Sequence, residues 1–172
     1  MQAEIITIGD ELLIGQVVDT NSAWLGRTLG EDGIKVTQIT SIQDDADQIS
    51  RTVNEALARV SIVLVTGGLG PTRDDITKHT LAELFGMRLV RDEQVYETVR
   101  RQLAVRGIAF NELNRGQALV PDGCTVLPNR NGTAPGMWFE RGGKILVSMP
   151  GVPFEMKALV TDEVLPRLRT HF

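Results

Sequence analysis

The sequence predicts an α/β fold in which a mostly parallel sheet is covered by helices on both faces. Short apolar stretches bounded by turn residues alternate, from residue 3 to residue 85, with longer stretches whose apolar side chains recur at helical spacing. Such alternation favours parallel strands, because each parallel connection needs a crossover helix. A chain of 172 residues is most simply one domain.

The first half of the chain has clear boundaries, because glycine and capping residues separate its apolar stretches. In chain order we expect a strand at Ala3–Ile8, a loop at Asp10–Gly15, a helix from about Asp19 to Gly33, a strand at Lys35–Ile42, a helix that starts at Asp44 or Asp45 and ends near Val60, a strand at Ser61–Val65, and a helix from about Asp75 to Phe85.

The second half is less regular. The elements expected there are a polar helix at Glu93–Arg106, a helical turn within Asn111–Ala118, strands at Thr125–Leu127, Met137–Glu140 and Lys144–Ser148, and a final helix from about Pro153 to Leu168. The Arg141-Gly142-Gly143 segment between the last two strands is typical of a hairpin turn.

The strand at Ser61–Val65 leads directly into a glycine-rich loop, Thr66-Gly67-Gly68-Leu69-Gly70-Pro71-Thr72-Arg73-Asp74-Asp75. Glycine lets the backbone turn sharply and approach a ligand closely. Main-chain N–H groups at such a loop and at the following helix start bind phosphate-like anions, and adjacent carboxylates hold divalent cations. The sequence therefore predicts a site for a nucleotide-type or pterin-type phosphate. The alternative is a plain turn in which Asp74 or Asp75 caps the helix.

Two familiar phosphate-binding loops do not fit this segment. A P-loop ends in Gly-Lys-Ser/Thr, whereas Gly70 is followed by Pro71-Thr72. A dinucleotide loop needs a third glycine where this chain has Arg73, counted from Gly68.

Composition narrows the function classes. The net charge of −4 gives no basic field for nucleic acid. Cys124 is the only cysteine and the two histidines, His79 and His171, are far apart in sequence, so a metal site has to rest on carboxylates. No apolar run approaches the ~18 residues of a membrane span, and the first residues lack a basic leader, so we expect a cytoplasmic protein without nucleic-acid or membrane partners.

Ligands of open parallel sheets bind beyond the carboxyl ends of the strands. Several unusual loops follow predicted strands directly, at residues 9–15, 43–45, 67–75, 129–136 and 148–153. This arrangement is expected to gather four carboxylates near the glycine loop, namely Glu11, Asp44, Asp74 and Asp75. Taken singly, each is better explained as a helix cap or a solvent-exposed residue, and it is their shared placement at strand ends that favours a site.

Four motifs, in this order, make the chain resemble one family. They are Gly9-Asp10-Glu11-Leu12-Leu13-Ile14-Gly15-Gln16, the loop Thr66–Asp75, Gly132-Thr133-Ala134-Pro135-Gly136-Met137, and Met149-Pro150-Gly151-Val152-Pro153-Phe154-Glu155-Met156. Together they resemble the N-terminal domain of CinA, the competence/damage-inducible protein, within the molybdopterin-binding MoaB/Mog-like superfamily. The resemblance covers residues 1–172 as a single domain. It implies a three-layer α/β/α sandwich with a mostly parallel sheet, and a chain without the C-terminal deamidase domain of CinA.

The resemblance also implies chemistry. CinA N-terminal domains are associated with metal-dependent hydrolysis of ADP-ribose, while Mog relatives bind molybdopterin and use two aspartates. Those aspartates look like Asp44 and Asp75 here, and Asp74 is the additional carboxylate of the CinA version.

The expected site follows from these correspondences. Catalysis is assigned to Asp44, Asp75 and Glu11, and a divalent cation such as Mg²⁺ to Asp74, Asp75 and Asp44. The phosphate ligand is assigned to Thr66, Gly67, Gly68, Gly70, Thr72, Arg73, Gly132, Thr133, Pro150 and Gly151.

Three functions remain open. The first is a metal-dependent nucleotide pyrophosphatase acting on ADP-ribose-type diphosphates. The second is a molybdopterin-binding module without that activity, which uses the same pocket with molybdopterin as its cofactor. The third is a noncatalytic scaffold. The resemblance further implies a homo-oligomer, either a dimer or a trimer.

Overall fold

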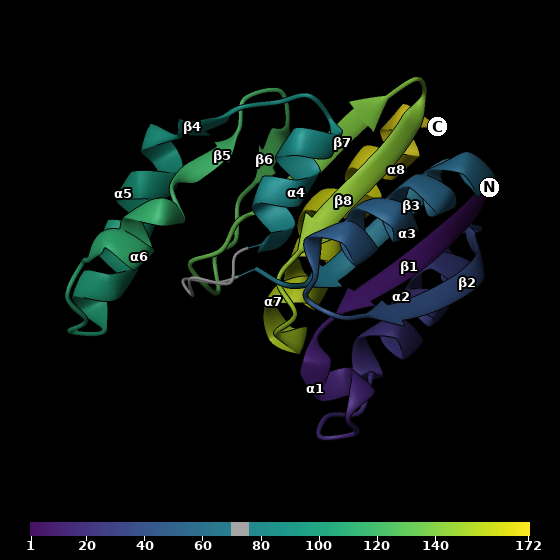
Figure 1. Cartoon of the computed structure of the whole chain (residues 1–172), viewed down its shortest axis with the longest axis horizontal. Coiled ribbons are helices and arrows are strands. Elements are labelled where there is room, and N and C mark those ends of the chain that lie inside the picture. Colours follow the sequence, from purple (N-terminus) through teal and green to yellow (C-terminus); the bar gives the residue numbers. More distant parts are fainter. Residues whose placement is uncertain (70–75) are drawn as a thin grey trace.

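A six-stranded sheet forms the centre of the molecule in the computed structural model, which describes residues 1–69 and 76–172. The strand order is β2-β1-β3-β8-β7-β6, and the first four strands are parallel (Figure 1). The strands are β1 (Gln2–Ile8), β2 (Lys35–Ile42), β3 (Ile62–Gly67), β6 (Thr125–Leu127), β7 (Gly136–Arg141) and β8 (Lys144–Met149).

The middle of the sheet is built from continuous apolar sequence. Every residue of β3 is buried, as expected for a parallel strand covered on both faces. In register, Ile5 pairs with Leu64 and Leu64 pairs with Val147, so β3 lies between β1 and β8. The carboxyl ends of β1, β3 and β8 therefore meet at one edge of the sheet.

The predicted hairpin is confirmed. Strands β7 and β8 are antiparallel, and Arg141 pairs with Lys144 across a two-residue turn. Both turn residues, Gly142 and Gly143, have positive φ angles of 59° and 77°. Such angles match the twist of a tight hairpin and are readily adopted by glycine.

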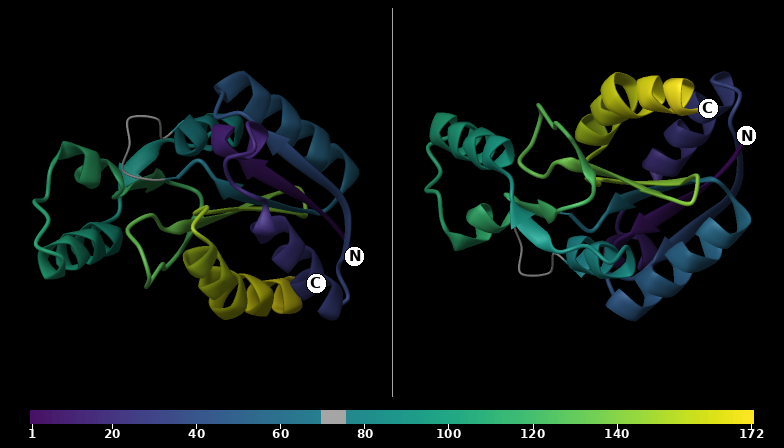
Figure 2. Two further views of the ribbon diagram at one scale, coloured as in Figure 1. Left: turned by 90° about the horizontal axis from the view of Figure 1, so that it is seen from below. Right: turned by 90° about the horizontal axis from the view of Figure 1, so that it is seen from above.

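Helices cover both faces of the sheet, which confirms the predicted three-layer α/β/α arrangement (Figure 2). One layer packs Leu25, Leu29, Met156 and Leu168 against the sheet, and it consists of α2 (Thr20–Glu31), α7 (Pro153–Leu159), η1 (Val160–Val164) and α8 (Leu165–His171). The other layer contributes Ile49, Val53 and Leu81, and it consists of α3 (Ala46–Arg59) and α4 (Ile76–Leu84).

A small lobe lies beside this sandwich (Figure 1). It contains a two-stranded antiparallel sheet and has its own apolar cluster, which includes Val95, Val99 and Val120. The lobe consists of β4 (Leu89–Arg91), α5 (Glu93–Val105), α6 (Glu112–Gly116) and β5 (Leu119–Pro121). The sequence predicts both helices but not the three-residue strands, which carry too little periodicity to be recognised.

Two further details depart from expectation. The segment expected to be a loop at residues 10–15 begins with a four-residue helix, α1 (Asp10–Leu13). The final helix contains one turn of π-helix at η1 and continues to His171. Within residues 1–69 and 76–172, no helix is both long and apolar enough to cross a bilayer.

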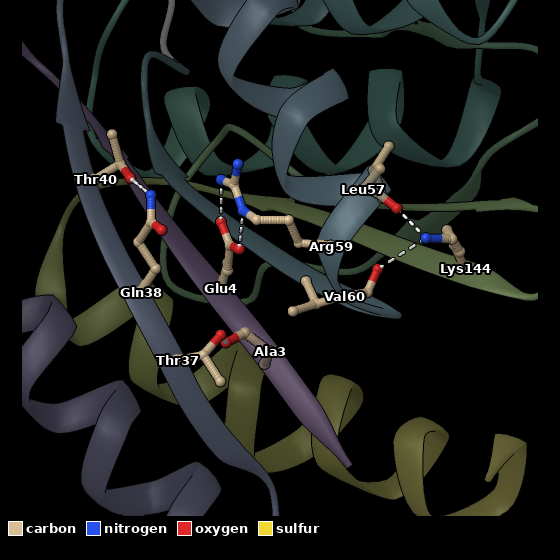
Figure 3. Close-up of polar contacts among 9 residues, drawn as sticks. All are labelled: Ala3, Glu4, Thr37, Gln38, Thr40, Leu57, Arg59, Val60 and Lys144. Carbon is tan, nitrogen blue, oxygen red and sulfur yellow. Dashed lines mark hydrogen bonds and ion pairs between the residues drawn. The ribbon is translucent and has the colours of Figure 1, made fainter.

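Polar contacts fix the end of the sandwich opposite the carboxyl edge of the sheet (Figure 3). The buried carboxylate of Glu4 on β1 accepts hydrogen bonds of 2.7 and 2.9 Å from the guanidinium of Arg59 at the end of α3. The ammonium of Lys144 donates to the carbonyl oxygens of Leu57 and Val60. Lys144 thus satisfies carbonyl oxygens at the end of α3, and both cations complement the negative end of the helix dipole.

Candidate functional site

A hollow of about 370 Å³ lies at the carboxyl edge of the sheet, where ligands of parallel sheets bind. Its walls come from the ends of β1 and β3, from α1 and the start of α2, and from the turn before α7. The lining residues include Thr7, Glu11, Asp19, Asn21, Thr66, Gly67, Gly68, Leu69, Gly151 and Pro153.

The glycines at the end of β3, Gly67 and Gly68, adopt conformations that residues with side chains rarely tolerate. Gly67 and Gly68 have φ angles of 99° and 70°. A Cβ atom at Gly67 would collide with the carbonyl oxygen of Ile8, and one at Gly68 would collide with the hydroxyl of Thr77. The backbone therefore passes between β1 and α4 with no room for a side chain, and it lines the hollow as bare main chain.

A second turn closes against the first one. The Thr66 hydroxyl donates a 3.1 Å hydrogen bond to the Pro150 carbonyl oxygen. The backbone of Gly151 approaches Gly67 so closely that a Cβ atom on Gly151 would lie 3.2 Å from the Gly67 Cα atom. The structure thus brings together four of the residues that the sequence assigns to ligand binding, namely Thr66, Gly67, Pro150 and Gly151.

Asn21 joins these two turns, and the sequence assigns it no role in the site. Its Nδ2 atom donates to the Gly151 carbonyl oxygen at 2.8 Å and to the Thr66 hydroxyl at 3.3 Å. The available signal is its position in the first turn of α2, two residues after the N-cap Asp19, whose carboxylate accepts from the Ser22 N–H. Asp19 caps the helix, so Asn21 is not needed as a cap and its side chain can face the edge of the sheet.

Of the predicted carboxylates, the structure describes Glu11 and Asp44, which lie on different elements. Glu11 is exposed and lines the hollow, and its carboxylate lies against Gly9. Asp44 lies at the end of β2, where its N–H donates to the Asp10 carboxylate at 3.4 Å. Asp45, rather than Asp44, caps α3 by accepting from the Gln48 N–H.

Five predicted site residues lie outside the described residues, namely Gly70, Thr72, Arg73, Asp74 and Asp75. Within the described ranges, no three side chains of His, Cys, Asp or Glu lie close enough together to hold a metal ion. Asp44, Asp10 and Glu11 therefore do not form a metal site by themselves. The predicted cation depends on the contribution of Asp74 and Asp75.

Gly132 and Thr133 line a different and larger hollow of about 1170 Å³, between α5 and residues 126–135. The loop that carries them is fixed by Asn129, which is buried and donates to the Ala134 carbonyl oxygen and to Glu155 Oε1. The Glu155 carboxylate occupies the position of a Cβ atom on Gly132. The structure therefore places these two residues apart from the hollow at Gly67.

Comparison with known proteins gives a consistent result. Residues 4–170 match the family described as "Probable molybdopterin binding domain". A CinA-like protein of Cytophaga hutchinsonii is 49% identical over 170 residues, which cover 99% of this chain and 41% of that protein. The chain thus spans about two fifths of the length of that curated relative.

Solved structures agree on the fold. The protein CinA of Thermoplasma acidophilum superimposes with a TM-score of 0.87 at 34% identity, covering 99% of this chain and 98% of that one. The molybdopterin biosynthesis enzyme MoaB of Thermus thermophilus has a TM-score of 0.64 at 20% identity, covering 97% and 91%, and shows the fold alone. The chain belongs to the CinA-like proteins of the probable molybdopterin-binding domain family, as its four motifs predict.

Proposed function

We propose that the chain binds a small phosphorylated ligand in the hollow at Gly67 and hydrolyses the diphosphate of ADP-ribose-type nucleotides with the help of a divalent cation. The observation that carries the proposal is the pair of bare main-chain turns at Gly67–Gly68 and Gly151, which line one hollow at the carboxyl edge of the sheet. Backbone close to a ligand, without side chains between them, suits a phosphate group.

The size of the hollow supports a ligand of this class. Small-molecule sites occupy roughly 300–1,000 Å³, and about 370 Å³ is available at Gly67. The net charge of −4 disfavours an anionic ligand at long range, so recognition has to come from short-range hydrogen bonds or from a cation.

Hydrolysis would form a bond from a water oxygen to one phosphorus and break the bond between that same phosphorus and the bridging oxygen, which leaves with the other phosphate. In ADP-ribose the products are AMP and ribose 5-phosphate. We assign Glu11, the carboxylate on the rim of the hollow, to accept the proton from the attacking water. Asp44 and Asp75 complete the proposed catalytic group, and Asp44, Asp74 and Asp75 would hold the cation, which would act as a Lewis acid.

A second candidate function is binding of molybdopterin without diphosphate cleavage. The description of the matching family favours it. A pterin phosphate would use the same glycine turns, because the phosphate is the group that both ligands share. The two functions therefore differ in which part of the ligand, a nucleotide or a pterin, occupies the rest of the hollow.

One experiment ranks these functions. Purified protein is incubated with ADP-ribose and Mg²⁺, with and without EDTA, and the products are separated by ion-exchange chromatography. The proposal expects AMP and ribose 5-phosphate in the presence of Mg²⁺ only, and large losses in Glu11→Gln and Asp75→Asn. Turnover of Asp75→Asn at the wild-type rate would refute the assignment of that residue.

Calorimetry with ADP-ribose and with a pterin phosphate completes the comparison. Preferential binding of the pterin, without cleavage of ADP-ribose, would establish the second function. Failure to bind either ligand at millimolar concentration would leave the noncatalytic scaffold. Light scattering on the same samples tests the proposed dimer or trimer.

A further inference from the structure

Asn21 connects the two turns of the hollow through a single amide group. Its Nδ2 atom donates to the Gly151 carbonyl oxygen at 2.8 Å and to the Thr66 hydroxyl at 3.3 Å. The Thr66 hydroxyl in turn donates to the Pro150 carbonyl oxygen, so the hydrogen bonds continue from Asn21 through Thr66 to Pro150. Two hydrogens of one side chain thus hold the end of β3 and the end of β8 together.

The orientation of this amide is set by its partners. The Gly151 carbonyl oxygen can only accept a hydrogen bond, so the Asn21 nitrogen must face it. The Asn21 Oδ1 atom then points elsewhere, and it is buried without a hydrogen-bond partner among the described residues. An acceptor that is buried without a partner destabilises a folded protein. Asn21 therefore adds two hydrogen bonds and one unfavourable burial.

We propose that Asn21 is a positioning residue, which fixes the separation of the Thr66–Gly68 and Pro150–Gly151 turns for ligand binding and lowers the stability of the fold in doing so. The inference rests on the proposed function, since it assumes that the ligand lies between these turns. The group that Asn21 holds in place is the Gly151 carbonyl, whose oxygen points toward α2. If that carbonyl were released, the exposed Gly151 peptide could rotate and direct its oxygen at an anionic ligand.

The test separates positioning from ordinary structural support. Asn21→Leu keeps a similar side-chain volume and removes both the amide donors and the unpartnered oxygen. We expect a Tm equal to or above that of wild type, and a Kd for ADP-ribose raised at least tenfold in calorimetry. Thr66→Val, which removes the shared hydroxyl, should also raise the Kd. Asn54→Leu on the exposed face of α3 is the matched control; it should leave the Kd unchanged and raise the Tm only slightly, through the higher helix propensity of leucine.

Two results would overturn the proposal. One is a Tm that falls in Asn21→Leu together with the affinity, as simple structural support requires. The other is an unchanged Kd in that variant.

Amide hydrogen exchange separates this proposal from the proposed function. If wild-type protein binds neither ADP-ribose nor a pterin phosphate, the proposed function fails by itself. Positioning is then judged from the exchange rates of the Gly67, Gly68 and Gly151 N–H groups. Faster exchange in Asn21→Leu at an unchanged Tm supports positioning, whereas unchanged exchange overturns it.

Discussion

The Cα atom of Gly67 faces the carbonyl oxygen of Ile8 on the neighbouring strand, and no Cβ atom fits between them. This contact, together with a φ angle of 99°, makes the position one that only glycine can occupy without movement of β1. The approach of the two strands therefore sets the floor of the hollow.

Gly67→Ala tests this contact. Alanine at a left-handed φ costs about 1–2 kcal/mol, and the collision with Ile8 adds to that cost, so we expect a lower Tm and loss of ligand binding. Thermal unfolding and calorimetry measure the two effects. Gly30→Ala is the matched control, because Gly30 lies within α2 and has nothing within 4 Å of its Cβ position. The free energy of unfolding of this control should rise by about 0.5–1 kcal/mol, because alanine has a higher helix propensity than glycine. A Gly67 variant as stable as the Gly30 variant would contradict the assignment.

Gly132→Ala should act through Glu155. The new methyl group displaces the Glu155 carboxylate, which breaks its 2.7 Å hydrogen bond with Asn129 and loosens residues 129–135. The free energy of unfolding should fall by about 1–2 kcal/mol, which is the cost of losing one buried hydrogen bond. The double-mutant cycle with Glu155→Ala provides the check. If the collision causes the loss, Gly132→Ala costs less in the Glu155→Ala background, and equal costs in both backgrounds would exclude it.

The ion pair between Glu4 and Arg59 should respond asymmetrically to mutation. The Glu4 side chain is 3% exposed and that of Arg59 is 44% exposed. Arg59→Ala leaves a buried carboxylate without its cation, whereas Glu4→Gln leaves a cation that water can solvate. The Tm should therefore fall further in Arg59→Ala than in Glu4→Gln. The reverse order in thermal unfolding at neutral pH would show that Glu4 reaches water.

Cys124 should be chemically inert in the folded protein. Burial raises the pKa of its thiol to about 11, from an ordinary value of 9.0. At pH 8 the reactive thiolate is then roughly 0.1% of the folded form and about 10% of the unfolded form. A disulfide reagent should accordingly react on the order of 100-fold more slowly with native than with urea-unfolded protein, and faster as the pH rises. Equal rates in both states would show an exposed thiol.

The pair of Asp32 and Arg169 links the end of α2 to α8, with hydrogen bonds of 2.7 Å between the two side chains. The Arg169 guanidinium lowers the pKa of the Asp32 carboxyl below its ordinary 3.8. A lowered folded-state pKa stabilises the protein above the ordinary value, and this contribution is lost as the pH falls through the lowered one. Asp32→Asn should therefore reduce the Tm at pH 7 and show a weaker further decline between pH 4 and pH 2 than wild type. Parallel Tm curves for the two proteins would exclude the linkage.

Periodicity and turn residues determined much of this fold. The buried run of β3, the hairpin glycines at 142 and 143, and the helix that begins at Pro153 were all predictable, because each depends on residues close together in sequence. The four motifs likewise predicted the family, which the comparisons confirm. The short strands β4 and β5 escaped prediction, whereas the equally short β6 was predicted, because three residues carry too little periodicity for a dependable assignment.

The sequence by itself predicted the α/β class, which the structure confirms, and it singled out Gly67, Gly68 and Gly151, which line the hollow at the carboxyl edge of the sheet. Only the tertiary structure decided which side chains meet there. It brought Asn21 to Thr66 and Gly151 across 45 and 130 residues of chain, and it placed Gly132 and Thr133 at a separate hollow. The physical reason is that secondary structure follows from local spacing, whereas contacts between loops depend on strand register and helix packing, which the whole core sets at once.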